Sequence, residues 1–203
     1  MSPHDIRTLA QLKALVGEPG PTSLRKEADH LHPVYRRWIE ASPFAVLATV
    51  GEHGLDTSPR GDPAPLVHVE DAHTLLLPER RGNHRIDTLR NLLADPRIAL
   101  LFLIPGTGET LRVNGHATLS VDPALLQRFE VQGKPPVCVI RVAVHKVFFQ
   151  CARAMIRSGL WQPVSAPADV PTAGQMLAAL TQGEVGGEPY DRELPQRQRS
   201  TLY

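Results

Sequence analysis

Short segments with strand-like hydrophobic patterns, most of them separated only by turns, constrain the fold of this 203-residue chain more than any other feature. Strand segments alternate in polarity or form short apolar runs bounded by Gly, Pro, Asn and Asp. Such segments occupy residues 44–50, a return strand after the turn at 51–54, 65–69, 74–77, 97–104, 110–120 and 136–149. A parallel sheet would need a helix between successive strands, and this chain has too few helical segments for that arrangement.

Helical periodicity is limited to a few segments, which favours a mainly β fold. It is found at residues 6–16, 31–41, 83–94 with Asn83 as the cap, 123–129 and 172–180. From Cys151 onward the chain is otherwise rich in Pro and Gly, so we expect irregular structure there. The pattern predicts a closed or nearly closed antiparallel barrel with peripheral helices.

The overall charge and the cysteine content exclude several classes of protein. The chain has 22 basic and 21 acidic residues, so its net charge of +1 makes no case for a nucleic-acid partner or an anionic membrane. Neither a run of about 20 apolar residues nor the apolar segment of a signal peptide is present. Two cysteines cannot form a disulfide framework or a four-sulfur zinc site. We expect a cytoplasmic protein.

The basic residues are 18 arginines and only 4 lysines, and arginine offers a planar fork suited to phosphate and carboxylate. Genome bias is the simpler explanation of the excess of arginine. The positions of the arginines in the sequence must therefore decide between genome bias and ligand binding. Residues 77–85 (LPERRGNHR) lie between a predicted strand and a predicted helix, where unpaired N–H groups and the helix dipole favour an anion. A phosphate site is one interpretation, and a solvated basic turn balanced by Glu79 and Asp87 is the other.

Two further segments carry arginines that are candidates for ligand contact. In residues 57–63 (TSPRGDP), the prolines and the glycine could hold Arg60 in a fixed direction, or the segment could simply be a kinked edge strand. Residues 151–161 follow the last long strand and combine two arginines with Trp161. That tryptophan could pack on an aromatic ligand, although a core position is the more ordinary interpretation.

Other candidate sites are weaker. His30 and His32 lack a nearby third ligand, so a metal site is not favoured. His116 and His145 on predicted strands could donate protons, but a core histidine is the more ordinary interpretation of each. The sequence contains no GxGxxG, no P-loop and no GxSxG motif, which argues against a Rossmann domain, a P-loop site and a serine-hydrolase elbow.

In combination and in this order, the three arginine-bearing segments resemble the pyridoxamine 5′-phosphate oxidase-like, FMN-binding split-barrel flavoproteins. They are most similar to a bacterial subgroup with TSPRGDP (here 57–63), LPxRxGNxRxDxLRN (77–91) and CxKAxxRSxLW (151–161) stretches. The resemblance implies a six-stranded antiparallel split β-barrel with peripheral helices, forming a homodimer with FMN at the subunit interface. Arg153 stands where the subgroup commonly has Lys, and the Arg-x-His substrate motif of true pyridoxamine phosphate oxidases has no counterpart.

By position, the resemblance assigns cofactor-binding residues but no catalytic one. Arg60, Asn83 and Arg85 would hold the FMN phosphate, with Thr88 near them and Arg80, Arg81 and Gly82 bordering the site. The strand that contains Arg112 would pass beside the flavin. The residues expected to come around from the partner subunit are Cys151, Arg153, Arg157 and Trp161.

The resemblance also implies a domain organisation and a function. We expect an N-terminal helical extension at 1–30, the FMN-binding barrel at 31–165, and a helical or irregular tail at 166–203 that packs on the barrel or the dimer partner. The implied function is an FMN-dependent oxidoreductase acting with a small-molecule substrate or an electron donor such as NAD(P)H, other than a pyridoxamine phosphate oxidase. The alternative is a flavin- or haem-binding module without turnover of its own.

Overall fold

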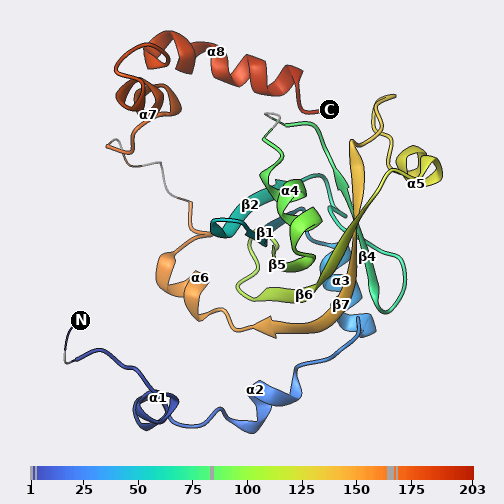
Figure 1. Ribbon diagram of the computed structural model, residues 1–203, viewed down its shortest axis with the longest axis vertical. Coiled ribbons are helices and arrows are strands. Elements are labelled where there is room, and N and C mark those ends of the chain that lie inside the picture. Colours follow the sequence, from blue (N-terminus) through green and yellow to red (C-terminus); the bar gives the residue numbers. More distant parts are fainter. Residues whose placement is uncertain (1, 3, 83–84, 164–166, 168) are drawn as a thin grey trace.

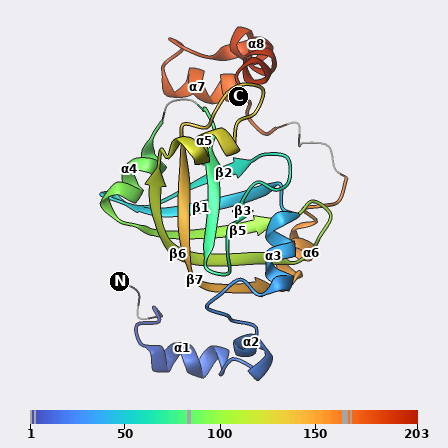
Figure 2. The ribbon, with the colours of Figure 1, turned by 90° about the vertical axis from the view of Figure 1, so that its right-hand side faces the viewer.

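A seven-stranded antiparallel sheet forms the centre of the molecule. The computed structural model describes residues 2, 4–82, 85–163, 167 and 169–203. The strands are β1 (Phe44–Gly51), β2 (Gly54–Gly61), β3 (His68–Val69), β4 (Thr74–Glu79), β5 (Arg97–Leu103), β6 (Thr110–Ser120) and β7 (Cys138–Gln150). They are hydrogen-bonded in the order β2-β1-β5-β6-β7-β4-β3, which wraps into a barrel (Figures 1 and 2). The predicted mainly β antiparallel fold is therefore confirmed.

The strand count differs from the expected six because of β3, which is only two residues long. The sequence predicts a strand over residues 65–69, but only its last two residues join the sheet. Pro65 has no N–H to donate, and the N–H of Leu66 bonds to the Ser42 carbonyl at 3.2 Å instead of to a strand. Leu66 and Val67 are nevertheless buried, which accounts for their strand-like apolar character.

Two ion pairs join strands from opposite ends of the sheet order. Arg60 of β2 lies 3.0 Å from Glu79 of β4, and Arg80, just after β4, lies 2.9 Å from Asp62, just after β2. All four side chains are largely buried, with 9% to 18% of their surface exposed. The seam of the barrel is therefore held by side chains here, and not by a backbone ladder.

The core fills the inside of the barrel. Strand β1 buries every second residue from Ala45 to Thr49, as expected when one face of a strand points inward. Phe102, Leu100 and Ile140 are among the largest fully buried side chains, and each contributes about 1.5–3 kcal/mol through burial. The apolar strand β5, which lies between β1 and β6 in the sheet, contributes two of these three side chains.

Eight helices surround the barrel within the described part of the chain. They are α1 (Leu9–Val16), α2 (Pro21–Arg25), α3 (Pro33–Glu40), α4 (Asp87–Ala94), α5 (Pro123–Arg128), α6 (Arg153–Ser158), α7 (Ala173–Leu180) and α8 (Gly187–Ser200). The pair α1–α2 extends from one end of the barrel, and the pair α7–α8 lies at the opposite end (Figures 1 and 2). No helix in the described ranges is long and apolar enough to cross a membrane.

Three helices were not predicted, and the predicted cap of α4 was wrong. Helix α4 starts at Asp87 after Ile86, so the predicted start at Asn83 was wrong; Asn83 itself lies outside the described residues. Helices α6 and α8 lie where irregular structure was expected, and α2 follows a run of Gly and Pro. Proline is tolerated at the first turn of α2, but Pro195 lies inside α8, where local preference opposes a helix.

Helix α8 forms because it packs closely on α7. A Cβ added at Gly174 would lie 2.3 Å from the Gly187 carbonyl oxygen, so only glycine permits this approach. Asp191 of α8 accepts a hydrogen bond from the Gly174 N–H at 2.7 Å and another from the Thr172 hydroxyl. The Asp191 carboxylate thereby accepts a hydrogen bond at the first turn of α7, where backbone N–H groups lack partners within the helix.

Candidate functional site

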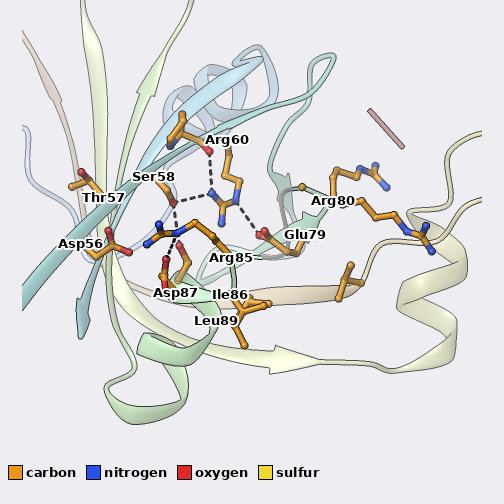
Figure 3. A pocket seen from close by; sticks show the side chains of 15 residues that line it. Asp56, Thr57, Ser58, Arg60, Glu79, Arg80, Arg85, Ile86, Asp87 and Leu89 are labelled. Carbon is orange, nitrogen blue, oxygen red and sulfur yellow. Dashed lines mark hydrogen bonds and ion pairs between the residues drawn. The ribbon is translucent and has the colours of Figure 1, made fainter. Parts of the chain in front are cut away.

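A cavity of about 650 Å³ lies beside the first turn of α4, between the ends of β2 and β4 (Figure 3). We call it the α4 cavity. It is lined by residues 56–60, 79–82, 85–89 and 137. Its volume falls within the range of about 300–1,000 Å³ that small-molecule and cofactor sites occupy.

Arg60 is the most firmly held cation of the α4 cavity. Its Nε donates to Glu79 at 3.0 Å, and its Nη1 donates to the Ser58 hydroxyl at 2.8 Å and to the Pro59 carbonyl at 2.9 Å. Within the described ranges, no partner occupies its Nη2. These contacts fix the plane of the guanidinium and leave one edge of the fork for a ligand.

Two hydroxyl groups lie beside this guanidinium. The Ser58 and Thr88 oxygens are 3.0 Å apart, and Thr88, in the first turn of α4, is only 6% exposed. Ile86 precedes the helix, and no side chain in the described residues caps it. The first N–H groups of α4 therefore lie at the cavity, together with the weak positive potential of a helix start.

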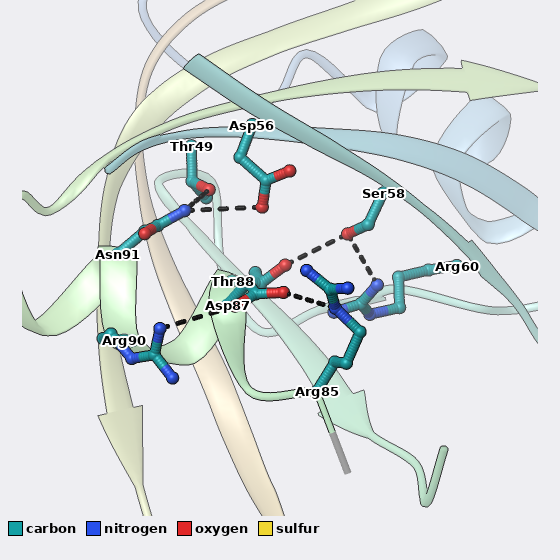
Figure 4. A network of polar contacts seen from close by, with 9 residues as sticks. All are labelled: Thr49, Asp56, Ser58, Arg60, Arg85, Asp87, Thr88, Arg90 and Asn91. Carbon is teal, nitrogen blue, oxygen red and sulfur yellow. Dashed lines mark hydrogen bonds and ion pairs between the residues drawn. The ribbon is translucent and has the colours of Figure 1, made fainter. Parts of the chain in front are cut away.

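Arg85 lies at the mouth of the α4 cavity, where 77% of its side chain is exposed. Its Nε donates to Asp87 at 2.8 Å, and this contact raises the pKa of Arg85. Arg90, one turn further along α4, reaches the same carboxylate at 3.5 Å but does not line the cavity (Figure 4). Asp87 thus orients Arg85 across the start of the helix.

Asn91 attaches α4 to the barrel (Figure 4). Its side-chain amide donates to the buried Thr49 hydroxyl at 3.0 Å and to Asp56 at 3.4 Å. A Cβ at Gly51 would lie 2.5 Å from the Asn91 side-chain oxygen, so a glycine makes room for this amide. The asparagine of the LRN stretch therefore positions the helix that carries Thr88 and does not itself line the cavity.

Arg80 points away from Arg60 and Arg85 (Figure 3). Its Nε donates to Asp62 at 2.9 Å, its Nη1 donates to the Phe129 carbonyl at 2.6 Å, and its guanidinium lies over the ring of Tyr203. Arg81 and Gly82 line the cavity beside it, and Arg81 is exposed. The structure thus brings together five residues of the predicted site: Arg60, Arg80, Gly82, Arg85 and Thr88.

Asn83 lies outside the described residues, and the other predicted residues that the structure describes lie outside the α4 cavity of their own chain. Arg112 of β6 lies over the Phe148 ring at 5.2 Å, and the Trp161 indole N–H donates to the Thr107 carbonyl at 2.7 Å. Cys151, Arg153 and Arg157 belong to the same stretch as Trp161, before and within α6. Trp161 retains 36% exposure, so the interpretation as a core residue was wrong.

The structure also changes the interpretation of the two strand histidines, His116 and His145. His116 and His145 are both exposed on the outer face of β6 and β7, with ring centroids 4.3 Å apart, so neither is a core histidine. The alternation of β6 places residues 111, 113, 115 and 117 inside and His116 outside. Among the described residues, no group of three or more possible ligands could hold a metal ion, and His30 and His32 belong to none.

The two cysteines should differ in reactivity. Burial, with a smaller contribution from the Glu79 carboxylate, raises the pKa of Cys138 to about 11, whereas a backbone hydrogen bond at Arg153 lowers the pKa of exposed Cys151. Because the thiolate is the reactive form, we expect one rapid thiol reaction per native chain with a disulfide reagent at pH 8. Cys151→Ser should abolish it and Cys138→Ser should not. Equal rates for both thiols would contradict this assignment.

Comparison with protein families shows to which family this chain belongs. Residues 31–151 match the sequence profile of the pyridoxamine 5′-phosphate oxidase family. The chain belongs to that family. The match covers the barrel from the start of α3 to the end of β7 and includes every residue that lines the α4 cavity. The predicted family is thereby confirmed, whereas the roles of individual motif residues stay predictions.

Several solved structures are similar to this family member. HupZ of Group A Streptococcus is 18% identical over 57% of this chain and 90% of its own, with a TM-score of 0.48. General Stress Protein 26 of Bacillus anthracis is 14% identical over 56% and 88%, with a TM-score of 0.42. A FAD-binding protein of Mesorhizobium loti is 13% identical over 61% and 96%, with a TM-score of 0.41. No curated protein matches the chain.

The three polar residues that contact Arg60 or Arg85 in the α4 cavity were not among the predicted ligand contacts of this family member. Ser58 bridges Arg60 to Thr88, and Glu79 and Asp87 each pair with one arginine of the cavity. The two carboxylates are visible in the sequence as countercharges of the basic turn. Glu79, however, pairs with Arg60 across the seam and not with an arginine of its own turn, so local sequence indicated its charge but not its partner.

Proposed function

We propose that this chain is an FMN-binding oxidoreductase of the pyridoxamine 5′-phosphate oxidase family and that its α4 cavity holds the FMN phosphate. The observation that carries the proposal is the arrangement around Arg60. A largely buried guanidinium, with a donor edge that no described residue occupies, lies beside two hydroxyls and a helix start that no described side chain caps, in a cavity of suitable size. This is the donor set that a phosphate monoester requires.

The charges of the α4 cavity support an anionic ligand. Four arginines line it together with three carboxylates: Arg60, Arg80, Arg81, Arg85, Asp56, Glu79 and Asp87. Glu79 and Asp87 orient Arg60 and Arg85 by accepting hydrogen bonds from the Nε of each guanidinium. A bound phosphate would leave these two hydrogen bonds intact. Apolar side chains of Ile86, Leu89 and Val137 complete the lining and suit a ligand that is not purely polar.

FMN supplies two-electron redox chemistry when it is bound, and the protein supplies binding, orientation and electrostatics. In this proposal Arg60, Arg85, Ser58 and Thr88 bind the phosphate, with Asn83 as a further ligand. The strand that contains Arg112 passes beside the flavin. A homodimer brings the residues of the α6 stretch to the cofactor from the partner subunit; these are Cys151, Arg153, Arg157 and Trp161. The substrate is a small molecule, the electron donor is NADH or NADPH, and the protein works in the cytoplasm.

The first test is flavin binding followed by reduction. Titrating the purified protein into FMN should quench flavin fluorescence with one FMN per chain, and NADH or NADPH should then bleach the bound flavin. Binding without reduction by either nucleotide would support the flavin-binding module without turnover in place of the oxidoreductase. Failure of FMN to bind would overturn the whole proposal.

Two arginines near the start of α4, Arg85 and Arg90, test the position of the phosphate. Arg85→Ala should weaken FMN binding about tenfold, because a hydrogen bond to a charged group contributes about 1.5–3 kcal/mol and this side chain is largely exposed. Arg90→Ala is the matched control, because Arg90 contacts the same Asp87 but does not line the cavity. Fluorescence titration of both variants measures the difference. Equal affinities would remove Arg85 from the site.

A further inference from the structure

A second cavity, of about 860 Å³, lies between the seam of the barrel and the C-terminal helix α8. We call it the α8 cavity. One wall consists of residues at the ends of β2 and β4, and the other consists of α8 and the residues that follow it. The two cavities are neighbours, because they share six lining residues: Pro59, Arg60, Glu79, Arg80, Arg81 and Gly82.

The charges of the α8 cavity are unbalanced. Its lining includes the side chains of four arginines but only two side-chain carboxylates: Arg60, Arg80, Arg81, Arg197, Asp62 and Glu79. Both carboxylates are already committed to the seam ion pairs. Within the described ranges, neither Arg81 nor Arg197 has a carboxylate partner. An occupant of this cavity therefore meets two guanidinium groups without countercharge, which favours an anion.

The remaining lining suits a flat, apolar body. Tyr190 and Tyr203 line the cavity together with leucines from α8 and from the barrel. Arg197 lies over the Tyr190 ring at 4.4 Å, and Arg80 lies over the Tyr203 ring at 5.7 Å. Each aromatic ring thus supports the position of a guanidinium, and guanidinium and phenol faces together are well suited to stacking with a planar ligand.

The α8 wall is attached to the barrel by its last residue. The Tyr203 hydroxyl donates to Asp62 at 2.7 Å, and this contact raises the pKa of Tyr203. Lys134 donates to the Tyr203 backbone carbonyl at 2.7 Å. Asp62 is only 9% exposed and also accepts from Arg80, so one largely buried carboxylate joins the seam of the barrel to the wall of the cavity.

We infer that the α8 cavity is a second ligand site, which takes a planar organic anion through Arg81 and Arg197. The site adjoins the flavin phosphate site and shares Arg81 with the α4 cavity, but it does not rest on the proposed function, because Arg197 and both tyrosines lie outside the α4 cavity. The ligand class is an aromatic or similarly flat compound with one phosphate or carboxylate group. The anionic group faces the arginines, and its flat body lies against the tyrosines and leucines.

The test uses phenyl phosphate as the probe and isothermal titration calorimetry on protein saturated with FMN. Phenyl phosphate should bind without releasing FMN and should bind more tightly than inorganic phosphate. Arg197→Gln should lower its affinity at least about tenfold. Arg192→Gln is the matched control, because Arg192 lies on the same helix, is largely exposed and does not line the cavity.

Equal affinity of the two variants for phenyl phosphate would overturn the assignment, and so would release of one FMN for each phenyl phosphate bound. Equal binding of inorganic and phenyl phosphate would overturn the organic ligand class. If FMN does not bind at all, the proposed function fails, but comparison of Arg197→Gln with Arg192→Gln in the flavin-free protein still decides whether this cavity takes the probe. Flavin fluorescence and calorimetric heat thus report the two proposals separately.

Discussion

Replacing Arg60 by Met is expected to lower the free energy of unfolding by about 2–3 kcal/mol and to reduce FMN binding by at least about a hundredfold. The variant leaves the Glu79 carboxylate without its partner, and that side chain is only 14% exposed. Breaking a fully buried ion pair costs about 3–5 kcal/mol, and the residual exposure of both groups lowers the cost for this pair to about 2–3 kcal/mol. Urea unfolding measures the stability change, and fluorescence titration measures the affinity.

The double variant Arg60→Met/Glu79→Met separates the two roles of the arginine. Removing both charges should restore at least half of the lost stability, because no unpaired carboxylate remains, whereas FMN binding should stay lost. Arg36→Met is the control, since the Arg36–Glu40 pair is exposed and should contribute less than about 1 kcal/mol. Full recovery of FMN binding in the double variant would show that Arg60 stabilises the seam and does not bind the phosphate.

The local sequence indicated that the backbone around Arg60 is stiff, but not which residue pairs with its guanidinium. The prolines and glycine of residues 57–63 predict a stiff segment, and β2 is indeed an edge strand that directs Arg60 into the cavity. Both interpretations of that segment therefore apply together. The partner Glu79 could not be predicted, because it approaches Arg60 only after the whole barrel has formed. Contacts across a seam depend on topology, which local patterns do not encode.

The helices that sequence patterns missed depend on contacts between distant segments. Helix α8 contains Pro195 and begins among glycines, so its local preferences are poor. Its stability comes from close packing on α7 and from Asp191 at the start of that helix. The α8 cavity and the attachment of Tyr203 were therefore invisible from the sequence, although Arg197 and Tyr203 are plain in it.

Alternation predicted most of the barrel wall but failed where a strand carries an extra residue. In the pairing of β6 with β7, Asn114 is opposite Lys146 and Gly115 is opposite Val144, which leaves His145 as an inserted residue. Such a bulge changes the face of the sheet on which the following residues lie. The consecutive residues His145 and Lys146 are therefore both exposed. A bulge of this kind has no dependable signature in a single sequence.

Gly115→Ala should destabilise the protein by about 3 kcal/mol, because the bulge brings the two long strands closer than any side chain permits. A Cβ at Gly115 would lie 2.1 Å from the Ala143 carbonyl oxygen and 3.0 Å from a Val142 methyl carbon. The obstacle is backbone in the middle of the β6–β7 ladder, so it cannot be relieved by turning a side chain. Relief requires β6 and β7 to separate, with loss of hydrogen bonds as well as of packing.

Gly61→Ala provides the matched control for this prediction. Gly61 also lies in a strand, but a Cβ there would be 3.8 Å from its nearest neighbours, which is ordinary contact. We expect its free energy of unfolding to change by no more than about 0.5 kcal/mol. Urea and thermal unfolding of both variants measure the difference even if Gly115→Ala is only partly folded at 25 °C. Similar stabilities would mean that the bulge opens without cost and that its geometry does not fix the register of β6 against β7.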